Sequence, residues 1–95
     1  MPEIRFRIRW PDGAEESCYS PSLVVKDFFS PGESYRLADF IERSRTALTL
    51  ASDRVEAKYG RRCSRAAAQL ARIETAAASF AATADPRVTV DAFDE

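Results

Sequence analysis

The segment Ile4–Trp10 alternates strictly between large apolar residues and arginines, and this alternation constrains the fold more than any other stretch. A period of two is typical of a strand with one buried face, because successive side chains point to opposite sides. A helix would bring an arginine into any apolar stripe, whereas a strand keeps Arg5, Arg7 and Arg9 together. The pattern therefore predicts a strand over about residues 3–10, with its apolar side in a core and its arginines exposed.

A tight turn is predicted directly after this strand, at Pro11-Asp12-Gly13. Proline presets φ for the second turn position, aspartate favours the third, and glycine accepts a positive φ. The chain then returns as a second strand over about residues 14–19. A two-residue loop would put Phe6 opposite Tyr19, but we favour a three-residue loop because it keeps Pro11 out of the ladder. The favoured register pairs Arg9 with Glu15, Phe6 with Cys18 and Arg5 with Tyr19.

Two amphipathic helices are predicted over about residues 35–59 and 64–84. Gly60 stands where a left-handed C-terminal residue belongs, and Ser64 is a good N-cap for the second helix. The many alanines favour this second helix by propensity alone, and the short connection requires an antiparallel pair. The stripes predicted to face the core are Leu37, Phe40, Ile41, Ser44, Leu48, Ala51, Val55 and Tyr59 in the first helix, and Cys63, Ala67, Leu70, Ile73 or Glu74, Ala77, Phe80 and Ala81 in the second.

The remaining segments complete a small α+β domain. Residues 22–29 suit either a short helix capped by Ser22 or a short strand. Residues 87–93 alternate again and predict a C-terminal strand, parallel to the first if the helices cover one sheet face. The expected architecture is a single domain over residues 1–95. In it the N-terminal β-hairpin and the C-terminal strand form one small sheet, with an antiparallel two-helix hairpin packed on one face.

The composition argues against several classes of function. The formal net charge is −1 over 95 residues, whereas a nucleic-acid-binding domain usually has a strong basic excess. With no histidine and only two cysteines, the chain has too few ligands for a closed zinc site or a disulfide framework. No apolar run is long enough to span a bilayer, and no signal peptide precedes the first strand. We therefore expect a cytoplasmic protein with reduced thiols, no metal or cofactor, and no nucleic-acid or membrane partner.

Arginines supply the first candidate binding site. Arg5, Arg7 and Arg9 form a row on the outer side of the hairpin, and Glu15 or Glu16 can neutralise part of it. The row is either a ladder of opposite charges between two strands or a surface for an anionic or protein partner. The sequence leaves both interpretations open.

A second basic cluster lies at the turn between the predicted helices. Arg61, Arg62 and Arg65, together with Lys58, gather positive charge around a helix start, where phosphate or carboxylate binding is favoured. No glycine-rich phosphate loop accompanies the cluster, and Gly60 is explained by the helix C-cap. A solvated turn is therefore the favoured interpretation, and an anion site is the alternative.

Cys18 and Cys63 are the candidate reactive thiols. Cys18 lies opposite Phe6 in the favoured register, on the buried side, where it is a small core residue. Cys63 stands beside Arg62 at a helix start, where a positive field favours a thiolate, but it also begins the inner stripe, so core packing is preferred. No serine–base pair, metal cluster or nucleotide motif accompanies them, so we expect no enzymatic activity.

Residues 75–84 carry no charge, and alanine lies on several sides of the helix predicted there. The segment is either an alanine-rich helix whose sides differ little in polarity, or an interface with a second copy or another protein.

Nearly the whole chain resembles a known family, through the segments RFRIRWPDG (5–13), CYSPSLVV (18–25), LADFIERSRTALTLASDRV (37–55), KYG (58–60), CSRAAAQL (63–70) and VTVDAF (88–93). These segments are similar to the nitrogen starvation response protein family of small bacterial proteins. The resemblance implies induction when nitrogen is scarce. It also implies a gene cluster with a nitrilase-type enzyme, a radical SAM protein, a flavin-dependent oxidoreductase and an acyltransferase-like protein, a type associated with using nitriles or cyanide as nitrogen sources. It supplies no catalytic residues.

These observations lead us to expect a non-enzymatic accessory protein of such a nitrile-utilisation gene cluster, which acts by association with a pathway enzyme or as a homodimer. The first alternative is a small-molecule or anion sensor that uses Arg61, Arg62 and Arg65. The second alternative is a thiol-dependent enzyme that uses Cys63 or Cys18.

Overall fold

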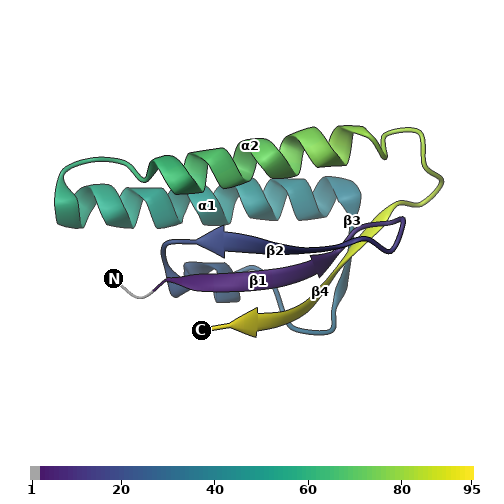
Figure 1. The fold of residues 1–95 in the computed structure, drawn as a ribbon, viewed down its shortest axis with the longest axis horizontal. Coiled ribbons are helices and arrows are strands. Elements are labelled where there is room, and N and C mark those ends of the chain that lie inside the picture. The colour runs from purple at the N-terminus through teal and green to yellow at the C-terminus, as the bar shows by residue number, and fades with distance from the viewer. Residues whose placement is uncertain (1–2) are drawn as a thin grey trace.

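The computed structural model describes residues 3–95, which form a four-stranded sheet and two long helices (Figure 1). The predicted α+β class, with helices packed against a sheet that contains the N-terminal hairpin, is confirmed. None of the helices in the described part of the chain is long and apolar enough to cross a membrane. The elements are β1 (Ile4–Arg9), β2 (Glu15–Ser20), the 3₁₀ helix η1 (Leu23–Asp27), β3 (Ser34–Arg36), α1 (Leu37–Tyr59), α2 (Ser64–Ala78) and β4 (Arg87–Asp94).

The hairpin has the favoured register, with Arg9 opposite Glu15, Phe6 opposite Cys18 and Arg5 opposite Tyr19. Its loop contains three residues. The Trp10 N–H donates to Ala14 O at 2.8 Å, and the Gly13 N–H donates to Trp10 O at 2.8 Å. Gly13 has a φ of 89°, the left-handed conformation that glycine adopts without strain.

The predicted parallel orientation of the C-terminal strand is wrong. The sheet order is β2-β1-β4-β3, and β4 runs antiparallel to β1. The three-residue strand β3, which the sequence did not reveal, carries the chain to the end of the sheet where β1 finishes. α1 and α2 run in opposite directions and return the chain to this same end, where Leu37 N–H donates to Pro86 O at 2.9 Å. A strand that starts there can pair with β1 only in the antiparallel sense.

The apolar side of β1 forms the middle of the core. Phe6 and Ile8 are fully buried, and so are Val90, which lies opposite Ile8 on β4, and Val88 earlier in that strand. Trp10 follows β1 and is also buried, as predicted. Its ring packs edge-on against Phe40 of α1 and stacks on Phe80 beyond α2, each with centroids 5.8 Å apart. One aromatic side chain thus joins the end of the hairpin to both helical segments.

The helix boundaries differ from the predicted ones for local reasons. α1 begins at Leu37 because Tyr35 and Arg36 belong to β3, and Tyr35 packs on Phe29 with ring centroids 5.2 Å apart. α1 ends as predicted at Gly60, whose φ is 82°. The first turn of α2 has Cys63 as its N-cap instead of Ser64. α2 ends at Ala78 instead of residue 84, because the backbone N–H groups that follow donate to carbonyls three residues earlier, as in turns tighter than an α-helix.

The side chains that face the core also differ in part from the predicted stripes. In α2 the buried residue near the start is Ala66 instead of Ala67, whereas Ile73 and Ala77 are buried as predicted. Tyr59, placed in the inner stripe of the first helix, is 57% exposed. Residues 22–29, left open between helix and strand, contain the 3₁₀ helix η1, and Ser22 Oγ accepts the Val24 N–H at 3.3 Å.

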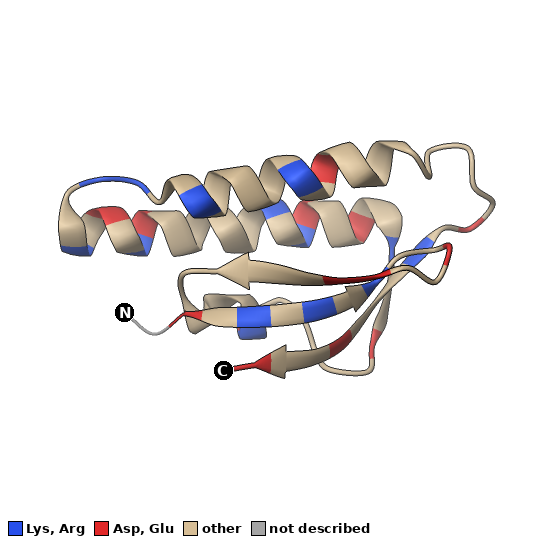
Figure 2. Cartoon of the chain, viewed as in Figure 1, with Lys and Arg blue, Asp and Glu red and all other residues tan. Residues whose placement is uncertain are grey.

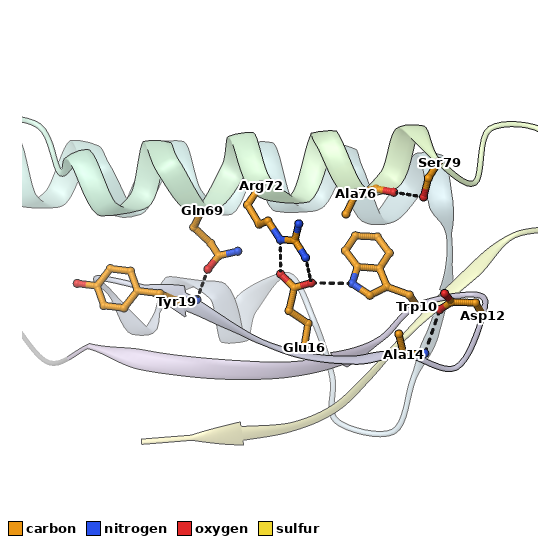
Figure 3. A network of polar contacts seen from close by, with 9 residues as sticks. All are labelled: Trp10, Asp12, Ala14, Glu16, Tyr19, Gln69, Arg72, Ala76 and Ser79. Atoms are coloured by element: carbon orange, nitrogen blue, oxygen red, sulfur yellow. Dashed lines mark hydrogen bonds and ion pairs between the residues drawn. The ribbon is translucent and has the colours of Figure 1, made fainter.

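α2 is attached to the edge strand β2 by polar contacts (Figure 3). Gln69 Oε1 accepts the Tyr19 N–H at 2.9 Å, so a side-chain oxygen satisfies a backbone N–H at the edge of the sheet. Glu16 accepts two hydrogen bonds from Arg72, at 3.1 and 3.2 Å, and one from Trp10 Nε1 at 3.1 Å. Since an unpaired edge strand is a template for unwanted pairing, these contacts also protect β2.

Ser44 supplies a test of core packing. Its side chain is fully buried on α1, and within residues 3–95 its hydroxyl has no hydrogen-bond partner. We predict that Ser44→Ala raises the free energy of unfolding by about 1 kcal/mol, because the desolvated hydroxyl is removed and alanine favours the helix. Urea denaturation measures the change.

Ser52→Ala is the matched control, because it removes a second buried hydroxyl from the same helix. Ser52 Oγ accepts the Cys63 N–H at 3.2 Å, so this variant should lower the free energy of unfolding by about 1 kcal/mol. A loss of stability in Ser44→Ala equal to that in Ser52→Ala would show that the Ser44 hydroxyl is satisfied.

Candidate functional site

One face of the sheet carries the predicted arginine row, and no helix crosses it. Arg5, Arg7 and Arg9 alternate with the buried residues of β1 and are exposed, as the strand pattern requires. Figure 2 shows these basic positions along β1, in front of which no helix lies. We name this surface the open face and define it by the outward residues of the four strands, which include Arg5, Arg7, Arg9, Glu15, Ser17, Arg36, Arg87, Thr89, Asp91 and Asp94.

Carboxylates on the neighbouring strands pair with two arginines of the row. Arg7 Nε donates to Asp94 Oδ2 at 3.0 Å, and Arg9 Nη2 donates to Glu15 Oε1 at 3.0 Å. Arg9 Nη2 also reaches Asp91 Oδ2 at 3.4 Å, where a register shift in β4 inserts an extra residue opposite β1. All these pairs are at the surface, where an ion pair contributes about 0–1 kcal/mol. They organise the arginines without removing them from solvent.

The open face also contains two arginines that the sequence analysis did not select. Arg36 of β3 lies directly opposite Arg87 of β4, and both are exposed. Like charges opposite each other on a sheet are destabilising. Arg87 Nε reaches Asp85 Oδ2 at 3.2 Å, but no ion pair of Arg36 occurs in the described chain. The alternation of Arg87 with Val88 was a usable signal, whereas the three residues of β3 were too few for a periodic pattern.

The basic cluster at the turn between the helices is divided in the structure. Arg62 turns back to α1, where Nη1 lies 2.8 Å from Asp53 Oδ1 and 3.6 Å from Glu56 Oε1. Arg65 lies toward the sheet, with Cζ 3.8 Å from the centroid of the Tyr19 ring. Arg61 is exposed in the turn. The three arginines therefore do not converge on one anion site, although they are close in sequence.

The two thiols lie in different environments. Cys18 is fully buried opposite Phe6, as expected. Burial, assisted by the charge of Glu16, raises the pKa of the Cys18 thiol to about 12. Cys63 is half-buried at the N-cap of α2, where its backbone N–H is held by Ser52. The two sulfurs thus belong to separate parts of the fold, one in the sheet core and one at the helix turn.

Within residues 3–95, no group of three or more histidine, cysteine, aspartate or glutamate side chains is arranged to hold a metal ion. What the geometry offers is a charged sheet face and basic side chains at the edge of α2. The structure is thus that of a small two-layer α+β protein with exposed charged side chains on one sheet face.

The chain belongs to a family of nitrogen starvation-induced proteins. Residues 5–93 match the family model described as nitrogen starvation-induced protein NitG. The resemblance inferred from the sequence segments is therefore confirmed over nearly the whole chain. No curated protein and no solved structure matches the chain.

We predict that Cys63 is alkylated by iodoacetamide in the folded protein and that Cys18 is not, because only Cys63 is accessible. Mass spectrometry after labelling at pH 8, with and without urea, distinguishes the two thiols. Cys63→Ser is the control, and rapid labelling of that variant without urea would contradict the burial of Cys18.

Cys18 should also contribute to the pH dependence of stability. Its pKa is about 12 in the folded protein against 9.0 for an unperturbed thiol, so the unfolded chain releases this proton first. The contribution is present below pH 9 and lost as pH rises toward 12. We predict that between pH 9 and 11 the free energy of unfolding falls more steeply in the wild type than in Cys18→Ala. Parallel curves from urea denaturation would contradict this assignment.

Proposed function

We propose that the protein is a non-enzymatic accessory protein of the response to nitrogen starvation, and that its open face binds an acidic surface of a partner protein. The observation that carries the proposal is the charge of this face. Five arginines, Arg5, Arg7, Arg9, Arg36 and Arg87, are opposed by three carboxylates, Glu15, Asp91 and Asp94.

The local charge contrasts with that of the chain as a whole. The formal net charge is −1, while the open face has two more arginines than carboxylates. Asp85 in the adjoining turn pairs with Arg87 and reduces this excess to one arginine. Such a patch attracts an oppositely charged partner and orients it during the encounter.

The internal ion pairs of the open face do not prevent binding. Arg7, Arg9, Glu15 and Asp94 each have side chains at least half exposed, so their pairs are weak and easily exchanged. Carboxylates of a partner can replace Asp94 or Glu15 at little cost. Arg36 gains most, because it lies opposite Arg87 and no ion pair of its own side chain occurs in the described chain.

The partner that we propose is an enzyme of a nitrogen-scavenging pathway. The family description supports the link to nitrogen starvation, and the resemblance to proteins of nitrilase-containing gene clusters supports the choice of an enzyme of that kind. In this proposal the chemistry belongs to the partner. The deep burial of Cys18 gives no support to the alternative of thiol catalysis.

The test is affinity capture from nitrogen-starved cells, using wild type and the double variant Arg7→Glu/Arg36→Glu. We expect a pathway enzyme to be recovered with wild type and reduced by about tenfold or more with the variant, since two favourable charges become repulsive. The recovery should also fall as salt is raised from about 0.1 to 1 M, because the screening length shrinks from about 10 to 3 Å.

The double variant Arg45→Glu/Arg61→Glu is the matched control, because it reverses two exposed charges on the helical side. It should recover the same enzyme as the wild type. Equal recovery with all three proteins, or no pathway enzyme with any of them, would refute the proposal. Sedimentation of the purified protein separates this from self-association, which would appear as a dimer sensitive to the open-face variant.

A further inference from the structure

A second surface, which shares Arg5 with the open face, lies where the edge strand β2 meets α2. A hollow of about 320 Å³ opens there to solvent. Two elements supply its three arginines, with Arg5 on β1 and Arg65 and Arg72 on α2, while Tyr19 comes from β2. We name it the Tyr19 hollow, and its lining residues are Arg5, Tyr19, Arg65, Ala68, Gln69 and Arg72.

We infer that the Tyr19 hollow binds a small oxyanion that carries two negative charges, such as a phosphate group or a dicarboxylate. Guanidinium groups recognise the paired oxygens of carboxylate and phosphate by parallel hydrogen bonds, which a compact ammonium does not form. The inference concerns a site that is absent from the sequence pattern, because Arg5 is distant in the chain from Arg65 and Arg72.

The ring of Tyr19 positions two of the arginines without using their hydrogen-bond donors. The Cζ atoms of Arg65 and Arg5 lie 3.8 and 5.8 Å from the ring centroid. A cation–π contact engages the flat face of the guanidinium, so its N–H groups in the plane stay available for an anion. Burial raises the pKa of Tyr19, with the charge of Arg65 opposing part of the effect, so the phenol stays neutral and repels no anion.

Gln69 adds a fixed donor to the same hollow. Its Oε1 accepts the Tyr19 N–H at 2.9 Å, which leaves the amide Nε2 as the donor at the other side of the group. Figure 3 shows Gln69 and Arg72 side by side on the face of α2 that is turned to β2. The amide orientation is thus determined by the sheet edge and requires no ligand.

Arg72 is held in place by Glu16 and retains free donors. Its Nε and Nη2 atoms bond to Glu16, while no hydrogen bond of Nη1 occurs within the described part of the chain. No carboxylate lines the hollow among residues 3–95. Glu3 Oε2 forms a long ion pair with Arg65 Nη1 at 3.6 Å, so one carboxylate borders the hollow. The lining itself therefore supplies guanidinium and amide donors, with the Glu3 carboxylate at its border.

Isothermal titration calorimetry with inorganic phosphate and with glutarate tests the inference, using acetate and chloride at equal ionic strength as controls. We expect saturable binding of phosphate, glutarate or both to the wild type, and none of acetate or chloride. The better ligand identifies whether phosphoryl or carboxylate oxygens are preferred. Equal heats with all four anions, or none with any, would overturn the site.

Gln69→Glu is the decisive variant, because the new carboxylate still accepts the Tyr19 N–H and keeps the edge contact. It should weaken binding by about tenfold or more through repulsion. Arg65→Gln should weaken it by a similar factor, whereas Arg61→Gln in the adjacent turn should bind as the wild type. Equal affinities in Gln69→Glu and the wild type, with circular dichroism unchanged, would refute the site.

This inference does not depend on the proposed partner. Arg7→Glu/Arg36→Glu, which should lose the partner, leaves Arg65, Gln69 and Arg72 unchanged and should bind the anion within about twofold of the wild type, a difference of some 0.4 kcal/mol. A tenfold loss in that variant would assign the anion to the open face instead.

Discussion

The burial of one side of β1 is the constraint on which the rest of the structure depends. β1 is a central strand, paired with β2 on one side and β4 on the other. Phe6 and Ile8 have no exposed surface, and burying side chains of this size contributes about 1.5–3 kcal/mol each. A slip of one residue would exchange buried and exposed sides and bring Arg5 or Arg7 into the core. The same alternation that builds the core therefore builds the open face.

The parts of the fold that sequence could predict are those whose causes are local. The hairpin register follows from a turn of adjacent residues, and the end of α1 follows from Gly60, a glycine in the left-handed conformation. The direction of β4 depended on β3, three residues that pair with a strand some fifty positions later. So short a segment has no periodicity, and its pairing is a property of the whole chain. Without it, the path of the chain around the sheet could not be derived.

The candidate sites also divide into those with local causes, which the sequence predicts, and those that depend on the whole fold. The exposed row of Arg5, Arg7 and Arg9 was predictable, because alternation alone decides which side of a strand a residue occupies. The turn arginines were not, because Arg62 contacts Asp53 on the preceding helix, whereas Arg65 contacts Tyr19, which lies far away in the chain. A cluster of like residues in sequence is thus weak evidence for a site. The Tyr19 hollow combines three elements and becomes visible only once α2 lies against β2.

The fold places two arginines opposite each other on β3 and β4, and Arg87 is ion-paired with Asp85. Arg36 directly precedes α1 and Arg87 directly follows Pro86, and the backbone bond from Leu37 N–H to Pro86 O joins these two connections. The positions of both arginines are therefore determined by the point where the helical pair leaves and rejoins the sheet. The junction therefore keeps the two backbone positions opposite each other, and both side chains are exposed. In the proposed function, a carboxylate of the partner would bind beside these two exposed side chains, whose spacing is set by the point where the helical pair leaves and rejoins the sheet.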